Sequence, residues 1–453
     1  GEEAQVKELA EAVNSGKLAV EDLDICVRRI LEFITRTPRF NKYKYSENPD
    51  LKAHAAVARK GATEGMVLLK NNGATLPLAG GKAALFGIGS YETVAGGTGS
   101  GHVNKAYIVN MDEGLEAAGI ELVGELRDMY TSYSEFAHNR RKAERDLSWW
   151  EVLGTELVPE LEVSQKCIER SAGKADYAIV TIRRNAGEGA DRTITDDFNL
   201  SVEETRMINQ ISTAFHAAGK KVIVVLNIGG VIETASWAGL ADAILLAWTP
   251  GQEAGHAIAD ILTGKVNPSG KLSMTFPVAY MDHPSSMNFP YSSTYDPIEA
   301  FFGRKGNGRK NVDYTEYSEG IWVGYRWFDK VPEKVMYPFG YGLSYTTFAY
   351  SKPIVKAAAD GGFTASVTVT NTGKAAGKEA VQLYVSAPEG GMEKPVKELK
   401  DFAKTNLLEP GQSQTLTFKV DAYSLASFNE EASQWETAAG IYKVHFAASS
   451  ADK

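Results

Sequence analysis

Hydrophobic positions between about residues 80 and 250 form short, continuous runs. Such runs lie at Ala83–Ile88, Asp176–Ile182, Val222–Asn227 and Ala243–Trp248. A run of this length without polar alternation suits a strand that is buried on both faces. Helical spacing of apolar residues separates the runs, as at Val202–Ala218. This alternation predicts an α/β domain with a doubly wound, mostly parallel sheet.

The pattern changes near residue 348, where apolar and polar residues begin to alternate. Thr364–Thr370 (TASVTVT) and Ala380–Val385 alternate with period two, and the segments Ser413–Val420 and Gly440–Phe446 follow. Several short strands spaced over about 100 residues are typical of a β-sandwich. The second predicted domain is therefore all-β.

The first residues of the chain have a third pattern. Apolar residues recur at helical spacing over residues 3–35, and Gly16 divides them into two predicted helices. Two helices alone have little to pack against, so we expect this segment to belong with a part outside the chain. The predicted organisation is a helical tail with a linker at 1–49, the α/β domain at 50–285, an aromatic and glycine-rich connection at 286–345, and the β-sandwich at 346–453.

Composition excludes several classes of function. The net charge of −9, with no basic run, argues against a nucleic-acid or anionic-membrane partner. Cys26 and Cys167 have neither a CxxC motif nor a histidine nearby, and the seven histidines form no HxH or HxxxH pair. A GxSxG motif is missing as well, which excludes the usual serine-hydrolase arrangement. The residues therefore predict neither a metal site nor a disulfide framework.

A loop that follows the predicted strand Asp176–Ile182 carries the most informative carboxylate. In the segment RRNAGEGADRTITDD, Glu188 lies between two glycines, and Asp191 and Arg192 follow it. Loops at the carboxyl ends of parallel strands are where functional residues gather in such domains. Flanking glycines allow the backbone to bring the carboxylate close to a ligand. The alternative is a solvated loop in which Glu188 only pairs with a neighbouring arginine.

A second loop, Ala95–Val103 (AGGTGSGHV), contains four glycines. Glycine-rich loops can expose backbone N–H groups to an anion, so a phosphate-binding role is one interpretation. The spacing matches neither GxGxxG nor GxxxxGK[ST], which disfavours a nucleotide site. Tight backbone packing is the other interpretation.

Seven segments, taken together and in order, resemble glycoside hydrolase family 3, in particular its β-glucosidases. They are Thr63–Leu78 (TEGMVLLKNNGATLPL), Ala95–Val103, Arg184–Arg192 (RNAGEGADR), Trp248–Gly255 (WTPGQEAG), Asn267–Pro277 (NPSGKLSMTFP), Glu319–Trp327 (EGIWVGYRW) and Tyr337–Phe348 (YPFGYGLSYTTF). The resemblance implies an α/β sandwich followed by a fibronectin type III-like (immunoglobulin-like) sandwich.

The same resemblance implies that a domain is missing. Family members carry a (β/α)8 barrel before the α/β sandwich, and residues 1–36 resemble the last barrel helix and the linker. The barrel holds the nucleophilic aspartate of the family, so no residue of this chain receives that role. We therefore expect a piece of a longer protein or a processed subunit, which is inactive by itself and has the barrel as its partner.

Carried onto this sequence, the resemblance makes Glu188 the general acid/base and Ser100 a residue that touches the sugar. Asp191 and Arg192 are expected to brace the loop.

The implied reaction is the retaining, exo-acting hydrolysis of terminal β-D-glucosyl residues from a β-glucoside or oligosaccharide, with no cofactor and no metal. The alternatives are a β-xylosidase or other exo-β-glycosidase of the family, and a non-catalytic carbohydrate-binding or assembly module. Homo-oligomer formation stays open, and the habit of relatives favours the periplasm or cell exterior over the cytoplasm.

Overall fold

The computed structural model describes residues 3–144, 157–185, 192–287 and 317–452. The chain forms two compact units, Gly1–His54 and Ala55–Lys453. The first unit contains α1 (Glu3–Asn14) and α2 (Val20–Arg36), as the sequence predicts, and neither helix buries a side chain. Helix α3 (Leu51–Gly65) then leads into the first strand. No helix in the described ranges is both long and apolar enough to cross a membrane.

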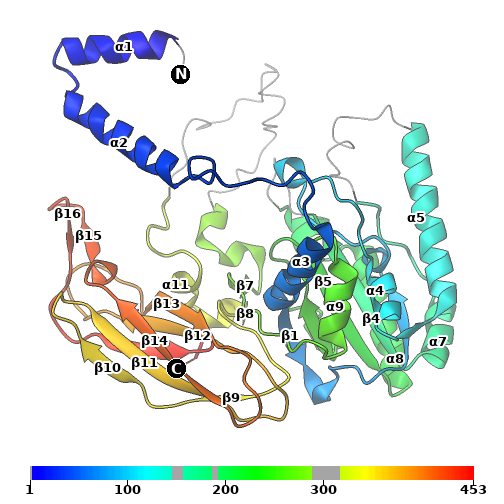
Figure 1. Cartoon of the computed structure of the whole chain (residues 1–453). Coiled ribbons are helices and arrows are strands. Elements are labelled where there is room, and N and C mark those ends of the chain that lie inside the picture. The colour runs from blue at the N-terminus through cyan, green and yellow to red at the C-terminus, as the bar shows by residue number, and fades with distance from the viewer. Residues whose placement is uncertain (1–2, 145–156, 186–191, 288–316, 453) are drawn as a thin grey trace. The chain divides into compact units, whose positions relative to one another are not determined.

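A six-stranded sheet forms the centre of the α/β part (Figure 1). Its strands are β1 (Val67–Asn71), β2 (Lys82–Phe86), β3 (Glu121–Leu122), β4 (Tyr177–Arg184), β5 (Lys221–Ile228) and β6 (Ala243–Leu246). Their order is β1-β6-β5-β4-β2-β3, and all neighbours are parallel except β1, which runs antiparallel to β6. The predicted mostly parallel sheet is confirmed.

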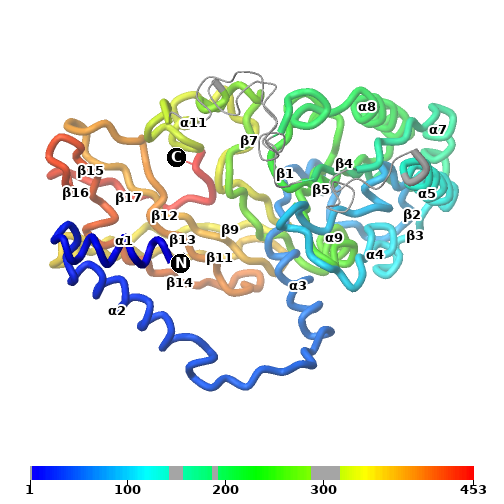
Figure 2. The backbone as a smooth tube through the Cα atoms, turned by 90° about the horizontal axis from the view of Figure 1, so that it is seen from above, coloured from blue at the N-terminus to red at the C-terminus, as the bar shows by residue number. Residues whose placement is uncertain are grey.

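Helices cover both faces of this sheet (Figure 2). On one face α5 (Gly124–Glu144) and α7 (Gln165–Lys174) contact β2, while α8 (Val202–Ala217) contacts β4 and β5. On the other face α4 (Met111–Ala117) packs against α9 (Ala254–Leu262). The sequence pattern did not predict α4, α5 or α7. Helix α4 is only seven residues long, and α5 is largely polar, so both give little apolar periodicity.

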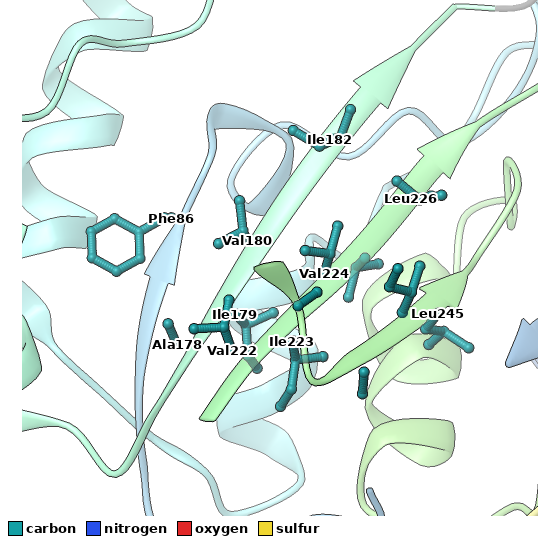
Figure 3. Close-up of a cluster of buried hydrophobic side chains, with 14 of the residues drawn as sticks. Phe86, Ala178, Ile179, Val180, Ile182, Val222, Ile223, Val224, Leu226 and Leu245 are labelled. Atoms are coloured by element: carbon teal, nitrogen blue, oxygen red, sulfur yellow. The ribbon is translucent and has the colours of Figure 1, made fainter. Parts of the chain in front are cut away.

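The central strands are buried along almost their whole length (Figure 3). Every residue of β4 is buried, and so is every residue of β5 after Lys221. Branched side chains such as Ile179, Val180 and Val224 fill the space between the sheet and the helices. Burial on both faces explains why these strands have continuous apolar runs instead of alternation.

The C-terminal part is a β-sandwich with its own hydrophobic core, as predicted. One sheet has the order β10-β11-β14 with β9 on β11, the other has the order β13-β12-β17, and β15 and β16 form a hairpin. The strands are β9 (Phe348–Tyr350), β10 (Ile354–Ala357), β11 (Phe363–Asn371), β12 (Ala380–Ser386), β13 (Glu398–Lys404), β14 (Ser413–Val420), β15 (Ser427–Asn429), β16 (Gln434–Glu436) and β17 (Lys443–Ala447). Burial alternates along β11, which is what period-two patterning produces on a half-buried strand.

Short elements join the two parts. Strand β7 (Phe276–Pro277) pairs with β8 (Val335–Tyr337), and α11 (Tyr325–Phe328) precedes β8. The compact units divide the chain once, after His54. The domain boundaries proposed from the sequence stay predictions.

Candidate active site

The predicted acid/base loop begins where β4 ends. Its central residues, 186–191, lie outside the described residues, and Glu188 and Asp191 are among them. Asn185 and Arg192 are described on either side. The structure therefore shows the residues that flank the loop on both sides.

Arg183 connects the end of β4 to the loop after β2. Its guanidinium donates hydrogen bonds to the backbone oxygen of Glu92 at 2.9 Å, to Glu92 Oε2 at 3.0 Å and to the carbonyl of Val158 at 2.8 Å. The side chain is only 6% exposed, so this ion pair is largely shielded from solvent.

Glu92 is held from a second direction by helix α5. Its carboxylate accepts a hydrogen bond from the Ser134 hydroxyl and lies 2.9 Å from Nε2 of His138. Burial by itself would raise the pKa of Glu92, but the Ser134 hydrogen bond and the Arg183 charge outweigh it and lower that pKa below its usual range. Glu92 is therefore a stable anion near neutral pH.

Arg184, the last residue of β4, anchors the other side of the strand end. Its Nη1 and Nη2 atoms form a bidentate ion pair with the Glu204 carboxylate, at 2.6 and 2.7 Å. Its Nε donates a hydrogen bond to the carbonyl oxygen of Asp197 at 2.8 Å. Glu204 also accepts a hydrogen bond from the backbone of Ser201, and the Ser201 hydroxyl accepts one from the backbone of Glu204. This capping box ties the start of α8 to the end of β4.

Arg192 holds the far end of the predicted acid/base loop. Its Nη1 lies 2.5 Å from Asp197 Oδ1, and the same carboxylate accepts a hydrogen bond from the backbone of Thr193 at 3.1 Å. These contacts fit the bracing role expected for Arg192, which stays a prediction together with the roles of Glu188, Asp191 and Ser100.

The glycine-rich loop starts from a buried anchor. Asn227, fully buried at the end of β5, accepts a hydrogen bond from the backbone of Val94 at 2.7 Å and donates to the carbonyls of Val94 and Trp248 at 2.9 and 2.7 Å. Further along, the turn Gly99–Gly101 places Ser100 on the surface, and Gly99 has a positive φ of 61°. A glycine is favoured there because other residues rarely adopt this conformation.

A pocket of about 390 Å³ lies beneath the glycine-rich loop. Its polar wall combines Glu92, Arg183 and His138 with His102, Lys105 and Asn185. Asn185 is the last described residue before Glu188, so this pocket adjoins the root of the predicted acid/base loop. Clustered donors and acceptors around a small cavity can bind a ligand that has several hydroxyl groups.

The structure thus adds residues that the sequence analysis did not single out. Glu92 and His138 are isolated in the sequence, and no local motif surrounds them. Asn227 has a recognisable signal, since it is the only amide in an otherwise apolar strand run. Among the described residues, no group of three or more His, Cys, Asp or Glu side chains could hold a metal ion.

Comparison with known proteins decides the family. Residues 66–345, more than half of the chain, match the glycosyl hydrolase family 3 C-terminal domain, and residues 379–450 match a fibronectin type III-like domain. The chain belongs to glycoside hydrolase family 3. The family and both predicted folds are therefore confirmed.

Individual relatives agree with this assignment. Beta-glucosidase A of Butyrivibrio fibrisolvens is 38% identical over 83% of this chain and 47% of its own length. Thermostable beta-glucosidase B of Acetivibrio thermocellus is 34% identical over 98% of this chain and 53% of its own length. This family 3 chain therefore spans about half the length of these curated relatives.

A solved structure extends the likeness to three dimensions. Beta-glucosidase 3B of Thermotoga neapolitana, solved in complex with α-D-glucose, superposes with a TM-score of 0.84 at 42% identity. The match covers 98% of this chain and 59% of that chain. The solved relative and both curated relatives carry the name β-glucosidase.

Proposed function

We propose that this chain supplies the general acid/base and part of the sugar-binding site of a retaining, exo-acting β-glucosidase. Glu188 is the proton donor and acceptor, Ser100 contacts the sugar, and Asp191 and Arg192 brace the loop. The nucleophile is an aspartate of a barrel domain that is not in this chain. The observation that carries the proposal is the position of the Glu188 loop, which starts beside the pocket at Asn185, directly after the buried Arg183–Glu92 pair.

The chemistry fits a carboxyl group held in this way. Retaining hydrolysis needs a protonated carboxyl about 5–5.5 Å from a second, ionised carboxylate. The protonated group gives its proton to the departing glycosidic oxygen, and the second carboxylate attacks the anomeric carbon to form a glycosyl-enzyme. The first group, now ionised, then takes a proton from water as water breaks the new bond. Both carboxyls return to their starting states, and no cofactor is consumed.

The first unit supports the proposal that a partner domain is required. Helix α2 has acidic and basic residues along one side, yet Ile30, Leu31 and Phe33 are 54–72% exposed. None of the residues of α1 and α2 is itself buried. Exposed apolar side chains of this number mark a surface that is normally covered. We propose that the family's barrel domain packs on this apolar surface of α2.

A chimera tests the catalytic assignment. The chain would be joined to the portion of the Thermotoga neapolitana enzyme that it does not match, and hydrolysis of 4-nitrophenyl β-glucoside would be measured. We expect Glu188→Gln to lower kcat by about 10²–10⁴-fold. The matched control is Glu203→Gln, which removes an exposed carboxylate on α8 and should leave kcat unchanged.

Chemical rescue sharpens this test. Azide should restore part of the activity of Glu188→Gly with an activated substrate, because azide attacks the glycosyl-enzyme without a general base. Activity of Glu188→Gln within a few-fold of the parent would instead favour a non-catalytic binding or assembly module. Turnover by the 453-residue chain alone would show that the nucleophile lies in this chain, contrary to the proposal.

The substrate class needs its own experiment. A panel of 4-nitrophenyl β-glucoside, β-xyloside and other glycosides, assayed on the chimera and on the natural full-length protein, separates a β-glucosidase from a β-xylosidase or other exo-β-glycosidase. We expect the highest kcat/KM with the β-glucoside.

A further inference from the structure

The segment from Ala95 to Val109, which contains the glycine-rich loop, is tied at both ends to the connection between β6 and α9. At its start the backbone N–H of Gly251 donates a hydrogen bond to the carbonyl oxygen of Ala95 at 2.7 Å. At its end the N–H of Val109 donates to the carbonyl oxygen of Gln252 at 2.9 Å. Backbone hydrogen bonds thus fix both ends of the segment.

A side-chain hydrogen bond adds a third attachment, between the end of this segment and Glu253. The hydroxyl of Tyr107 donates to Glu253 Oε1 at 2.5 Å, and Nδ1 of His256 lies 2.6 Å from Oε2. Glu253 is only 8% exposed, whereas Tyr107 is 45% exposed. A buried carboxylate therefore holds a residue of a surface loop.

Glu253 is suited to hold Tyr107 because its carboxyl group stays ionised. Burial by itself would raise the pKa of Glu253, but the hydrogen bonds with Tyr107 and His256 outweigh it and lower that pKa below its usual range. Glu253 also directly precedes α9, where the helix dipole favours a negative charge. Hydrogen bonds to an ionised acceptor are roughly twice as strong as neutral ones.

Ser100 lies between these attachments, on the surface turn of the glycine-rich loop. Local hydrogen bonds, such as the one from the N–H of Gly101 to the carbonyl oxygen of Thr98 at 3.1 Å, fix the shape of this turn. We propose that Glu253 is a positioning residue, which acts through Tyr107 to hold Ser100 where it contacts the sugar. This role rests on the proposed function, because it presupposes that Ser100 touches the sugar.

Hydrogen exchange of the 453-residue chain tests the attachment without any activity. Tyr107→Phe removes only a hydroxyl, and the amide of Val109 should then exchange at least about ten-fold faster, because the end of the loop detaches more often. Amides of β4 and β5 should exchange as in the parent. Tyr442→Phe, which removes a hydrogen bond of 2.9 Å to Ala438 in the β-sandwich, is the matched control and should leave Val109 unchanged.

Kinetics of the natural full-length protein test the consequence for the sugar. With 4-nitrophenyl β-glucoside, Tyr107→Phe should raise KM about ten-fold, because the loop is in the binding conformation for a smaller fraction of the time. The value of kcat should stay within about two-fold, since Glu188 lies in a different loop. General damage to the fold would instead lower kcat at an unchanged KM. Glu253→Gln keeps an oxygen that accepts from Tyr107, so its KM should lie between those of the parent and Glu253→Ala.

Ser100→Ala separates this role from the proposed function. If Tyr107 acts through Ser100, adding Tyr107→Phe to Ser100→Ala should raise KM by no more than about two-fold further. A ten-fold rise in both backgrounds, or unchanged Val109 exchange in Tyr107→Phe, would overturn the positioning role alone. An unchanged KM in Ser100→Ala would remove the proposed sugar contact, and the positioning role with it.

Discussion

Gly114 of α4 and Gly255 of α9 face each other so closely that neither position has room for a side chain. A Cβ atom at Gly114 would lie 2.1 Å from the carbonyl carbon and oxygen of Gly255, and a Cβ at Gly255 would lie 1.9 Å from the carbonyl oxygen of Asn110. The obstacles are backbone atoms, which cannot rotate away. This contact sets how near the two helices come, and Asn110, which directly precedes α4, also lines the pocket beneath the glycine-rich loop.

Alanine at either position is therefore expected to be destabilising. Gly114→Ala or Gly255→Ala should lower the free energy of unfolding by about 3 kcal/mol, at the upper end of overpacking costs, because the helices must separate. The urea midpoint, followed by circular dichroism, measures the change. Gly173→Ala on α7 is the matched control, since open space surrounds that helical position. There alanine should stabilise by roughly 0.5–1 kcal/mol.

The buried pair between Arg184 and Glu204 gives a second prediction. Arg184→Met should cost about 3–5 kcal/mol, because it leaves the Glu204 carboxylate buried without its counter-charge. The double variant Arg184→Met/Glu204→Met should recover most of this loss. Thermal or urea unfolding of the three proteins measures the coupling. For comparison, Arg206→Met breaks an exposed pair with Glu162 and should cost less than about 1 kcal/mol. Equal losses of stability in Arg184→Met and Arg206→Met would show that burial of the ion pair does not determine its contribution.

Glu64 links the α/β part to the β-sandwich and should make their docking sensitive to acid. Its carboxylate pairs with Lys378 and, at 2.8 Å, with Lys404. Burial would raise the pKa of Glu64, but the two ammonium groups lower it to about 2. A carboxyl with a lowered pKa stabilises the fold above the pKa of the unfolded chain, and this stabilisation disappears as the pH falls from about 5 toward 2.

Glu64→Gln should therefore reduce stability by roughly 1–2 kcal/mol at pH 7, after allowance for partial solvent screening, and change little at pH 2. Unfolding midpoints measured across this pH range would show the two proteins converging in acid. Glu409→Gln removes an exposed carboxylate of the β-sandwich and should track the parent at every pH. A difference in unfolding midpoint between Glu64→Gln and the parent that stays the same at every pH would argue against the electrostatic explanation.

Glu160 should produce the opposite pH dependence. Burial raises its pKa to about 7, although the backbone N–H groups of Ile88 and Leu161 donate to its carboxylate. A carboxyl with a raised pKa in the folded chain favours folding at low pH, and the benefit is lost as the pH rises through about 7. The parent should lose up to roughly 3 kcal/mol between pH 4 and pH 8 through this group.

Glu160→Gln should remove most of this loss, since the amide oxygen still accepts the hydrogen bond from Leu161 without acquiring a charge. The difference in unfolding midpoint between the variant and the parent should grow from pH 5 to pH 8. Glu135→Gln, an exposed position on α5, is the control and should show no such trend. If the parent and Glu160→Gln lose the same stability as the pH rises, the titration of a group other than Glu160 causes the loss.

The sequence by itself was sufficient for the fold class. The runs that became β4 and β5 are apolar at nearly every position because both faces of the sheet are covered, and β11 alternates because one face of its sheet meets the sandwich core. Such patterns follow from burial alone and are local. The position of the Glu188 loop after β4 was predictable for the same reason.

Only the tertiary structure decided which residues line the pocket beside Asn185. Glu92, His138 and Arg183 come from three elements separated by 45 residues or more, and their contacts depend on sheet order and helix packing, which leave no local sequence signal. The closeness of Gly114 and Gly255 has the same origin. A pattern along the chain records whether a side chain is buried, whereas the identity of its neighbours is determined when distant segments pack together.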